Sequence, residues 1–339
     1  MSERTTMNGK PVFTVPAKTI INFKSGFVHK LLCDGPTFSA GTACNFSCSF
    51  CYVPEAMQKQ GEWLKEHGVT GAHEDIVVRR ENPVDIVRQQ LTDAKGRPKF
   101  LDPNDLRVIY ASPLVDVAGN MELVKETVEI CKVILTLTNW HIRLLSKSNL
   151  LPKVSQALSD WYLDRQHPLT WTHGSPRERI IYGVSTGTLD DNLAKAFEQG
   201  TPLVSKRIES LHWLQDNGYR TFGMVCPSLP QTDGAQFSKN MRDALRYDRC
   251  EHVWAECINA RGESFTRTYD ALVAAGFWDD AEQLRIVSQN KVAWENYAQT
   301  TFLFHADYCP PEKLRFLQYV TKDTRPWWES QQSKGAILL

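Results

Sequence analysis

The sequence predicts an α/β fold, a partial (β/α)6 barrel followed by a C-terminal helical appendage. Short apolar segments rich in β-branched residues alternate with segments of helical period between residues 31 and 275. Strands that alternate with helices of about ten to fifteen residues are typical of parallel βαβ units. The number of repeats fits an incomplete barrel. A chain of 339 residues, 42% of them hydrophobic, is large enough to bury the core of such a fold.

The segment before the repeats is expected to bring a loop to the edge of the barrel. Residues 1–30 are predicted to form an irregular lead with one strand, and residues 30–42 the strand that ends at a group of cysteines. Residues 52–82 are polar and contain glycine and histidine, which predicts an insertion with a short helix at 55–67.

The repeats follow from apolar spacing and from proline and glycine signals. Pro83 is suited to the first turn of one helix, and Gly218 to the end of another. Ile208, Leu211 and Leu214 have helical spacing in the second of these. We expect helices at 83–94, 121–135, 151–163, 205–217, 236–247 and 264–275, and strands at 106–111, 141–145, 179–185, 220–225 and 252–258.

The chain after residue 276 is expected to form the appendage. It should contain a helix at 279–299, a short helix after Cys309-Pro310-Pro311, and a tail that carries Trp327 and Trp328.

The most informative motif is C-x3-C-x2-C, formed by Cys44, Cys48 and Cys51. Three thiolates on one short loop can hold three corners of a [4Fe-4S] cluster, which leaves the fourth iron open to a small molecule. The motif could instead be half of a zinc site, a source of disulfides, or a chance group of core thiols. The other six cysteines are scattered singly at 33, 131, 226, 250, 257 and 309, and none forms the second pair that zinc would need.

With the aromatic Phe50 before its last cysteine, the triplet resembles the signature of the radical S-adenosylmethionine enzymes. Several runs further along resemble the spore photoproduct lyase and DNA repair photolyase-like branch. They are Ser112 to Asp116, Leu145 to Ser148, Gly183 to Ser185, Phe197 to Pro202, Lys206 to Ile208, Gln215 to Gly218 and Cys226 to Pro230. The matches are spread from about Lys30 to Gly262, a span that is most of the chain.

The resemblance implies cofactors and site residues. Cys44, Cys48 and Cys51 would hold the cluster, S-adenosylmethionine would bind its open iron, and reductive cleavage would give a 5′-deoxyadenosyl radical. Phe50, Ser112, Lys147, Ser185 and Asn259 are expected to contact cofactor, because they stand near predicted strand ends or the cluster loop. A flavodoxin or ferredoxin is expected as electron donor.

The sequence does not identify the substrate. The branch suggests a nucleobase or DNA lesion, but no cysteine stands between Cys51 and Cys131 to return hydrogen to a repaired thymine, and Tyr110 holds the comparable place. The formal net charge is zero, which does not favour a broad nucleic-acid surface. A small molecule or peptide substrate, a non-catalytic iron-sulfur redox sensor and a zinc-stabilised nucleic-acid binder are the alternatives.

Composition also bears on location. No apolar run is long enough to span a membrane, and the first residues are polar. We therefore expect a cytoplasmic protein, in a compartment that keeps thiols reduced.

Overall fold

The computed structural model describes residues 6–111, 113–164, 174–259 and 263–339. These residues form a mixed α/β fold with thirteen α-helices. The chain divides into two compact units. The first comprises Met1–Ser47, Val53–Tyr182 and Asp216–Arg220, and the second Cys48–Tyr52, Gly183–Gln215 and Thr221–Leu339.

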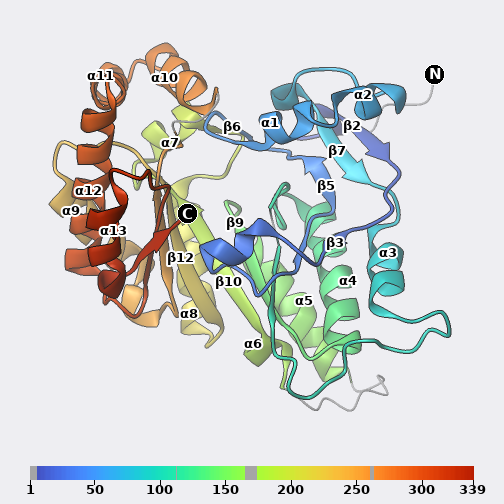
Figure 1. Ribbon diagram of the computed structural model, residues 1–339. Helices are drawn as coiled ribbons and strands as arrows, with labels where there is room; N and C mark the ends of the chain where they lie inside the picture. Colours follow the sequence, from blue (N-terminus) through green and yellow to red (C-terminus); the bar gives the residue numbers. More distant parts are fainter. Residues whose placement is uncertain (1–5, 112, 165–173, 260–262) are drawn as a thin grey trace. The chain divides into compact units, whose positions relative to one another are not determined.

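The first unit contains a mainly parallel sheet in the order β10–β9–β8–β4–β3. Its strands are β3 (Ile21–Asn22), β4 (Thr37–Phe38), β8 (Val108–Ala111), β9 (His141–Ser146) and the start of β10 (Ile180–Thr186). Strand β8 pairs in parallel with β4 and β9, and β3 pairs antiparallel with β4. The helices α3 (Pro83–Leu91), α4 (Met121–Leu137), α5 (Leu151–Leu163) and α6 (Pro176–Arg179) belong to the same unit (Figure 1). The predicted helices and strands from 83 to 185 are confirmed, with shifted ends.

The prediction of one strand over 30–42 is wrong. The chain forms a 3-10 helix at Gly26–Lys30, then β4, then β5 (Gly41–Ala43). Gly35 has φ +120° and is followed by Pro36, which has no N–H to donate, so a continuous strand cannot pass here. The cysteine motif therefore follows β5, which pairs antiparallel with β7 (Val77–Arg80) in a separate small sheet.

That small sheet has the order β1–β2–β7–β5. Strands β1 (Thr6–Met7) and β2 (Lys10–Val15) come from the lead, which holds more strands than predicted. The predicted helix at 55–67 is two helices, α1 (Val53–Gln58) and α2 (Gly61–Glu66), followed by a 3-10 helix at His73–Asp75. Strand β7 was not predicted, because its two arginines make the segment polar although Val77 and Val78 are buried.

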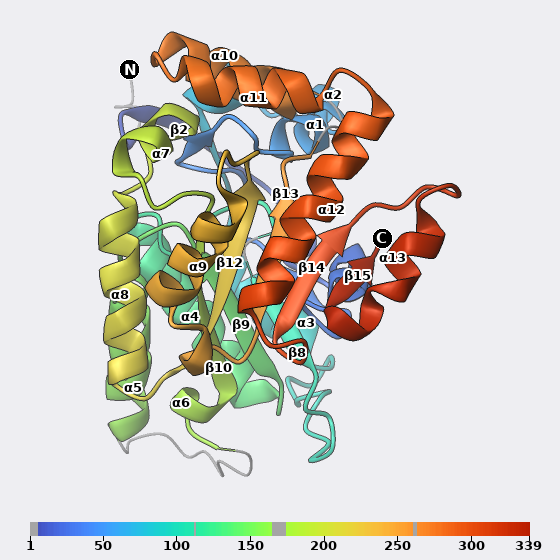
Figure 2. The same cartoon turned by 90° about the vertical axis from the view of Figure 1, so that its left-hand side faces the viewer.

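The second unit contains a sheet in the order β10–β12–β13–β14–β15. Strands β12 (Arg220–Ser228), β13 (Val253–Cys257), β14 (Leu314–Gln318) and β15 (Ala336–Leu338) pair in parallel, each with the next. Helix α12 (Lys291–Tyr308) packs against β13, β14 and the helix α9 (Gly234–Leu245) (Figure 2). The other elements of this unit are α7 (Asp191–Phe197), β11 (Glu198–Gln199), α8 (Val204–Asp216), a 3-10 helix at Tyr247–Arg249, α10 (Ser264–Ala274), α11 (Trp278–Val287), α13 (Arg325–Ser330) and a 3-10 helix at Gln332–Lys334.

The C-terminal segment is not the purely helical appendage that was predicted. The expected helix at 279–299 is two helices, α11 and α12, and the side chain of Asn290 accepts the N–H of Ala293 to begin the second. Strands β14 and β15 extend the parallel sheet of the second unit. Closure of the strands into a partial barrel stays a prediction. Among the described residues, no helix combines the length and apolar character needed to cross a bilayer.

A histidine lies in the core of the second unit. His305 on α12 is 1% exposed, and its Nε2 lies 3.3 Å from the hydroxyl oxygen of Ser228. The rings of Phe237 and Phe316 flank it, with centroids 6.1 Å away in each case. Burial lowers the pKa of His305 from 6.5 to about 4, because the charged imidazolium has no water around it.

This buried histidine predicts a loss of stability in mild acid. Between pH 6.5 and about 4 the unfolded chain binds a proton that folded His305 excludes, so the free energy of unfolding falls as the pH falls through this range. The contribution is at most about 3 kcal/mol, at 1.36 kcal/mol for each unit of pKa. Urea unfolding of the His305→Gln variant should show a weaker pH dependence. The matched His67→Gln variant, at an exposed histidine, should behave like wild type.

Candidate metal centre

The three motif cysteines differ from most of the other cysteines in exposure. Cys44, Cys48 and Cys51 are partly exposed, as is Cys226, whereas the remaining five cysteines are buried. Burial raises the thiol pKa of Cys250, Cys257 and Cys309 to about 12, and it also raises the thiol pKa of Cys33 and Cys131. Iron binds the thiolate form of cysteine. The buried thiols are therefore poor ligands, and the motif supplies three of the four accessible ones.

In the first unit, Cys44 is linked to the loop that follows β8. The backbone N–H of Asp116 donates to the sulfur of Cys44 at 3.4 Å. The neighbouring Asn45 is 1% exposed, and its side-chain amide donates to the carbonyl of Gly119 at 3.1 Å. A Cβ at position 119 would lie 2.3 Å from the oxygen of that amide, so only glycine allows this approach. An N–H directed at a cysteine sulfur stabilises its thiolate and tunes an iron-sulfur cluster.

Asp116 joins the C-terminal ends of two strands of the first unit. Its carboxylate accepts the hydroxyl of Ser146 at 2.7 Å and the N–H of Lys147 at 2.8 Å, both at the end of β9, and the N–H of Ala118 at 2.8 Å. Loss of solvation raises the pKa of Asp116, although these hydrogen bonds and the charge of Lys147 act to lower it. The carboxylate does not cap α4, since Asn120 does so by accepting two backbone N–H groups.

In the second unit, the part of the loop from Cys48 to Tyr52 is held against α7 and α10. Cys48 lies in the short strand β6 (Ser47–Cys48), which pairs with β11, and the N–H of Cys51 donates to the carbonyl of Cys48 at 3.1 Å. Ser49 donates through its N–H and its hydroxyl to the carbonyl of Phe197, at 2.9 and 3.2 Å. The rings of Phe50 and Phe197 lie 5.8 Å apart between centroids.

Helix α10 supplies a cation to the same loop. Arg267 donates through Nε to the carbonyl of Ser49 at 3.0 Å and through an Nη to the carbonyl of Cys51 at 2.6 Å. The hydroxyl of Thr268 lies 3.1 Å from that of Ser49. We call Arg267, Thr268 and Ser49 the loop clamp. Sequence reasoning missed all three, and only the position of Ser49 between the cysteines signalled it.

Two predicted site residues of the first unit lie where the sequence placed them, at strand ends. Tyr110 is in β8, is 3% exposed, and its ring packs on Phe27 with centroids 5.4 Å apart. Lys147 follows β9 and is partly exposed, and its charge acts on Asp116. Ser112 lies outside the described residues. The roles expected for these residues stay predictions.

Ser185 and the neighbouring ion pair have structural contacts in the second unit. Ser185 in β10 is 4% exposed, its hydroxyl donates to the carbonyl of Cys226 at 3.4 Å, and its carbonyl accepts from Arg207 at 3.2 Å. Arg207 and Glu198 form an ion pair at 2.5 Å in which both side chains are fully buried. Both residues belong to runs that resemble the photolyase-like branch, and the structure places their ion pair in the core of the second unit.

Asn259 lines a cavity at the C-terminal ends of β13 and β14. The cavity measures about 160 Å³ and its walls include Glu256, Trp294, Gln318 and Tyr319. In parallel sheets ligands bind at these strand ends. The cavity thus offers an indole, a phenol, two amides and a carboxylate to a ligand.

Within the described ranges, no three His, Cys, Asp or Glu side chains converge in a group that would hold a single metal ion. Each cysteine of a four-iron cluster ligates a different iron, so its sulfurs stand farther apart than the ligands of one ion. The convergence of the three thiols stays a prediction.

No protein-family model and no curated protein sequence matches the chain. Its structure is similar to that of a tyrosine-to-phenylalanine variant of spore photoproduct lyase, with TM-score 0.51 and 11% identity over 77% of this chain and 66% of that one. Spore photoproduct lyase complexed with dinucleoside spore photoproduct matches with TM-score 0.50 and the same identity and coverage. SuiB of Streptococcus suis, bound to its precursor peptide SuiA, matches with TM-score 0.38 and 9% identity over 72% of this chain and 44% of that one.

The chain therefore spans 60% to 66% of the length of the lyase structures that it matches. At 11% identity the likeness concerns the fold. The resemblance to spore photoproduct lyase, predicted from the sequence, is confirmed at the level of the fold.

Proposed function

We propose that this chain is a radical S-adenosylmethionine enzyme whose [4Fe-4S] cluster is held by Cys44, Cys48 and Cys51. The observation that carries the proposal is a triplet of accessible cysteines on a loop that other residues anchor at both ends, in a fold similar to spore photoproduct lyase. Three ligands leave one iron for S-adenosylmethionine. When bound, the cluster would supply the electron that cleaves this cofactor to methionine and a 5′-deoxyadenosyl radical.

The residues around the triplet fit an anionic cluster. The N–H of Asp116 is directed at the sulfur of Cys44, and the guanidinium of Arg267 lies on the carbonyls beside Cys51. Both groups favour negative charge on the sulfurs. Phe50, packed on Phe197, covers the loop with an apolar ring, and we assign it the role of excluding water from the cluster. Lys147, Ser112, Ser185 and Asn259 remain our proposed contacts to S-adenosylmethionine.

For the substrate, we propose a nucleoside-sized molecule that carries a planar base, such as a damaged nucleobase. The cavity beside Asn259 combines Trp294 and Tyr319, which can stack on a base, with the amide of Gln318, which can pair with its edge. The zero net charge favours a small ligand over a long stretch of DNA. We propose Tyr110 as the residue that returns hydrogen to the product. A small molecule of another class or a peptide is the alternative substrate.

The cluster assignment predicts different outcomes for two cysteine variants. Cys48→Ser should lose most of its iron after anaerobic reconstitution and should form no 5′-deoxyadenosine with dithionite and S-adenosylmethionine. Cys226→Ser is the matched control, since Cys226 is also partly exposed but lies outside the triplet, and it should load iron like wild type. A wild-type protein with a full cluster that forms no 5′-deoxyadenosine would reject the enzyme and favour a redox sensor. Iron loss in Cys226→Ser would show that the triplet does not act alone.

The loop clamp predicts an effect on cluster retention and potential. Arg267→Met removes two charge-assisted hydrogen bonds to the loop carbonyls, each worth about 1.5–3 kcal/mol. We expect iron loss to a chelator to be about tenfold faster or more, and the midpoint potential to become more negative because a nearby cation is gone. Arg285→Met is the control, because Arg285 pairs with Glu282 on the exposed face of α11. Equal iron loss and potential in both variants would contradict the role of Arg267.

A further inference from the structure

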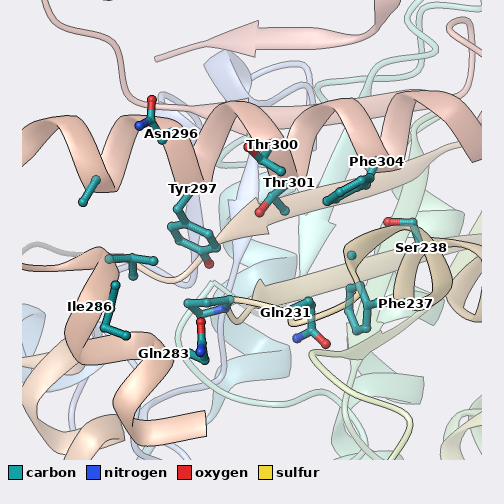
Figure 3. Close-up of a pocket in the computed structure, with 14 residues that line it drawn as sticks. Gln231, Phe237, Ser238, Gln283, Ile286, Asn296, Tyr297, Thr300, Thr301 and Phe304 are labelled. Atoms are coloured by element: carbon teal, nitrogen blue, oxygen red, sulfur yellow. The ribbon is translucent and has the colours of Figure 1, made fainter. Parts of the chain in front are cut away.

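A second binding region lies in the second unit, among the helices α9, α11 and α12. It consists of two neighbouring cavities of about 260 Å³ and 420 Å³, which share Pro230, Gln231, Phe237 and Gln283 as walls. Figure 3 shows the first cavity, which we call the apolar cavity. None of the candidate metal-centre residues lines either one.

The apolar cavity has a largely hydrocarbon wall. Its apolar side chains include Phe237, Ile286, Tyr297 and Phe304. Gly234 keeps it open beside α9, since a Cβ there would lie 2.2 Å from the ring of Phe304. Ile286 is 40% exposed, so an apolar group can reach the cavity from solvent. An apolar body is thus the part of a ligand that this cavity accepts.

One polar group in the apolar cavity has no use within the fold. Ser238 on α9 is 1% exposed, and its hydroxyl points toward the interior of the cavity in Figure 3. Among the described residues the hydroxyl has no hydrogen-bond partner, in contrast to the buried serines Ser146 and Ser155, which have them. Because the hydroxyl faces the cavity, it can form a hydrogen bond with an occupant.

The second cavity, which we call the acidic cavity, collects negative charge. Asp190, Asp233, Asp279 and Asp280 line it, and no lysine or arginine occurs among its described walls. Asp190 and Asp233 accept backbone N–H groups at the starts of α7 and α9. Burial, together with the charges of Asp279 and Asp190, raises the pKa of Asp280. A cation bound here would relieve the repulsion among these carboxylates.

We propose that the two cavities together bind a small organic cation that joins an apolar body to a protonated amine. The body lies among Phe237, Tyr297 and Phe304, within reach of the Ser238 hydroxyl, and the ammonium lies beside Asp279 and Asp280. The combined space suits a molecule of metabolite size. This site does not depend on the cluster chemistry proposed above.

The test compares three probes of one shape and different charge. Calorimetry with the full chain at pH 7.5 and low salt uses 3-phenylpropylamine, 3-phenylpropanol and 3-phenylpropanoate. We expect the amine to bind about fivefold or more tighter than the alcohol, as one close charge pair gives in water, and the propanoate to bind weakest. Failure of the amine to bind, or equal binding of the amine and either other probe, overturns the proposal.

Variants locate the binding. Asp280→Asn should weaken the amine about fivefold and leave the alcohol unchanged. Glu282→Gln is the matched control, because it removes one charge from the same helix at a residue that pairs with Arg285 outside the cavity. An equal effect of both variants overturns the assignment, since the attraction would then be general. Thr300→Phe, at an exposed position on the cavity wall, should abolish binding of both amine and alcohol. Unchanged binding in that variant, with the fold intact by circular dichroism, also overturns it.

Discussion

The candidate metal centre depends on a loop that must be fixed in place without the use of its cysteine side chains. A thiolate that binds iron contributes little to holding the loop, so most of the anchoring falls to other residues. Asn45 donates a hydrogen bond to the carbonyl of Gly119, and Ser49 donates one to the carbonyl of Phe197. Arg267 donates to the carbonyls of Ser49 and Cys51. Such supporting contacts commonly set the geometry and affinity of a metal site.

Each unit also uses one buried charged group to join strand ends and loops. In the first unit Asp116 links the end of β9 to the loop that follows β8. In the second, Arg207 bonds Glu198, Thr201, Pro202 and Ser185 together beside β10. A buried ion pair contributes little net stability compared with apolar packing. The hydrogen bonds of Arg207 nevertheless define one arrangement of the segment that also carries Phe197, the partner of Ser49 and Phe50.

The sequence predicted the regular part of the fold and missed what long-range contacts decide. Helix α5 and strand β8 have clear periods and clear ends, so local physics was sufficient. Strands β7 and β14 carry arginines, and their pairing with strands distant in the sequence, such as β2 and β13, makes them strands. The cysteine spacing predicted the candidate ligands, because consecutive loop residues need no tertiary information. Arg267 stands more than two hundred residues away, and nothing local connects it to the motif.

The zero net charge of the chain conceals strong local fields. A net charge of zero argues against processes that need a broad charged surface, such as sequence-independent binding along DNA. It leaves room for sites in which a few charges act at short range. Arg267 places a cation on the carbonyls of the cluster loop, and four aspartates converge on the acidic cavity. The first favours an anionic cluster and the second a cationic ligand. Two sites of opposite preference can thus coexist in one chain, because dissolved salt screens Coulomb interactions between exposed charges over about 10 Å.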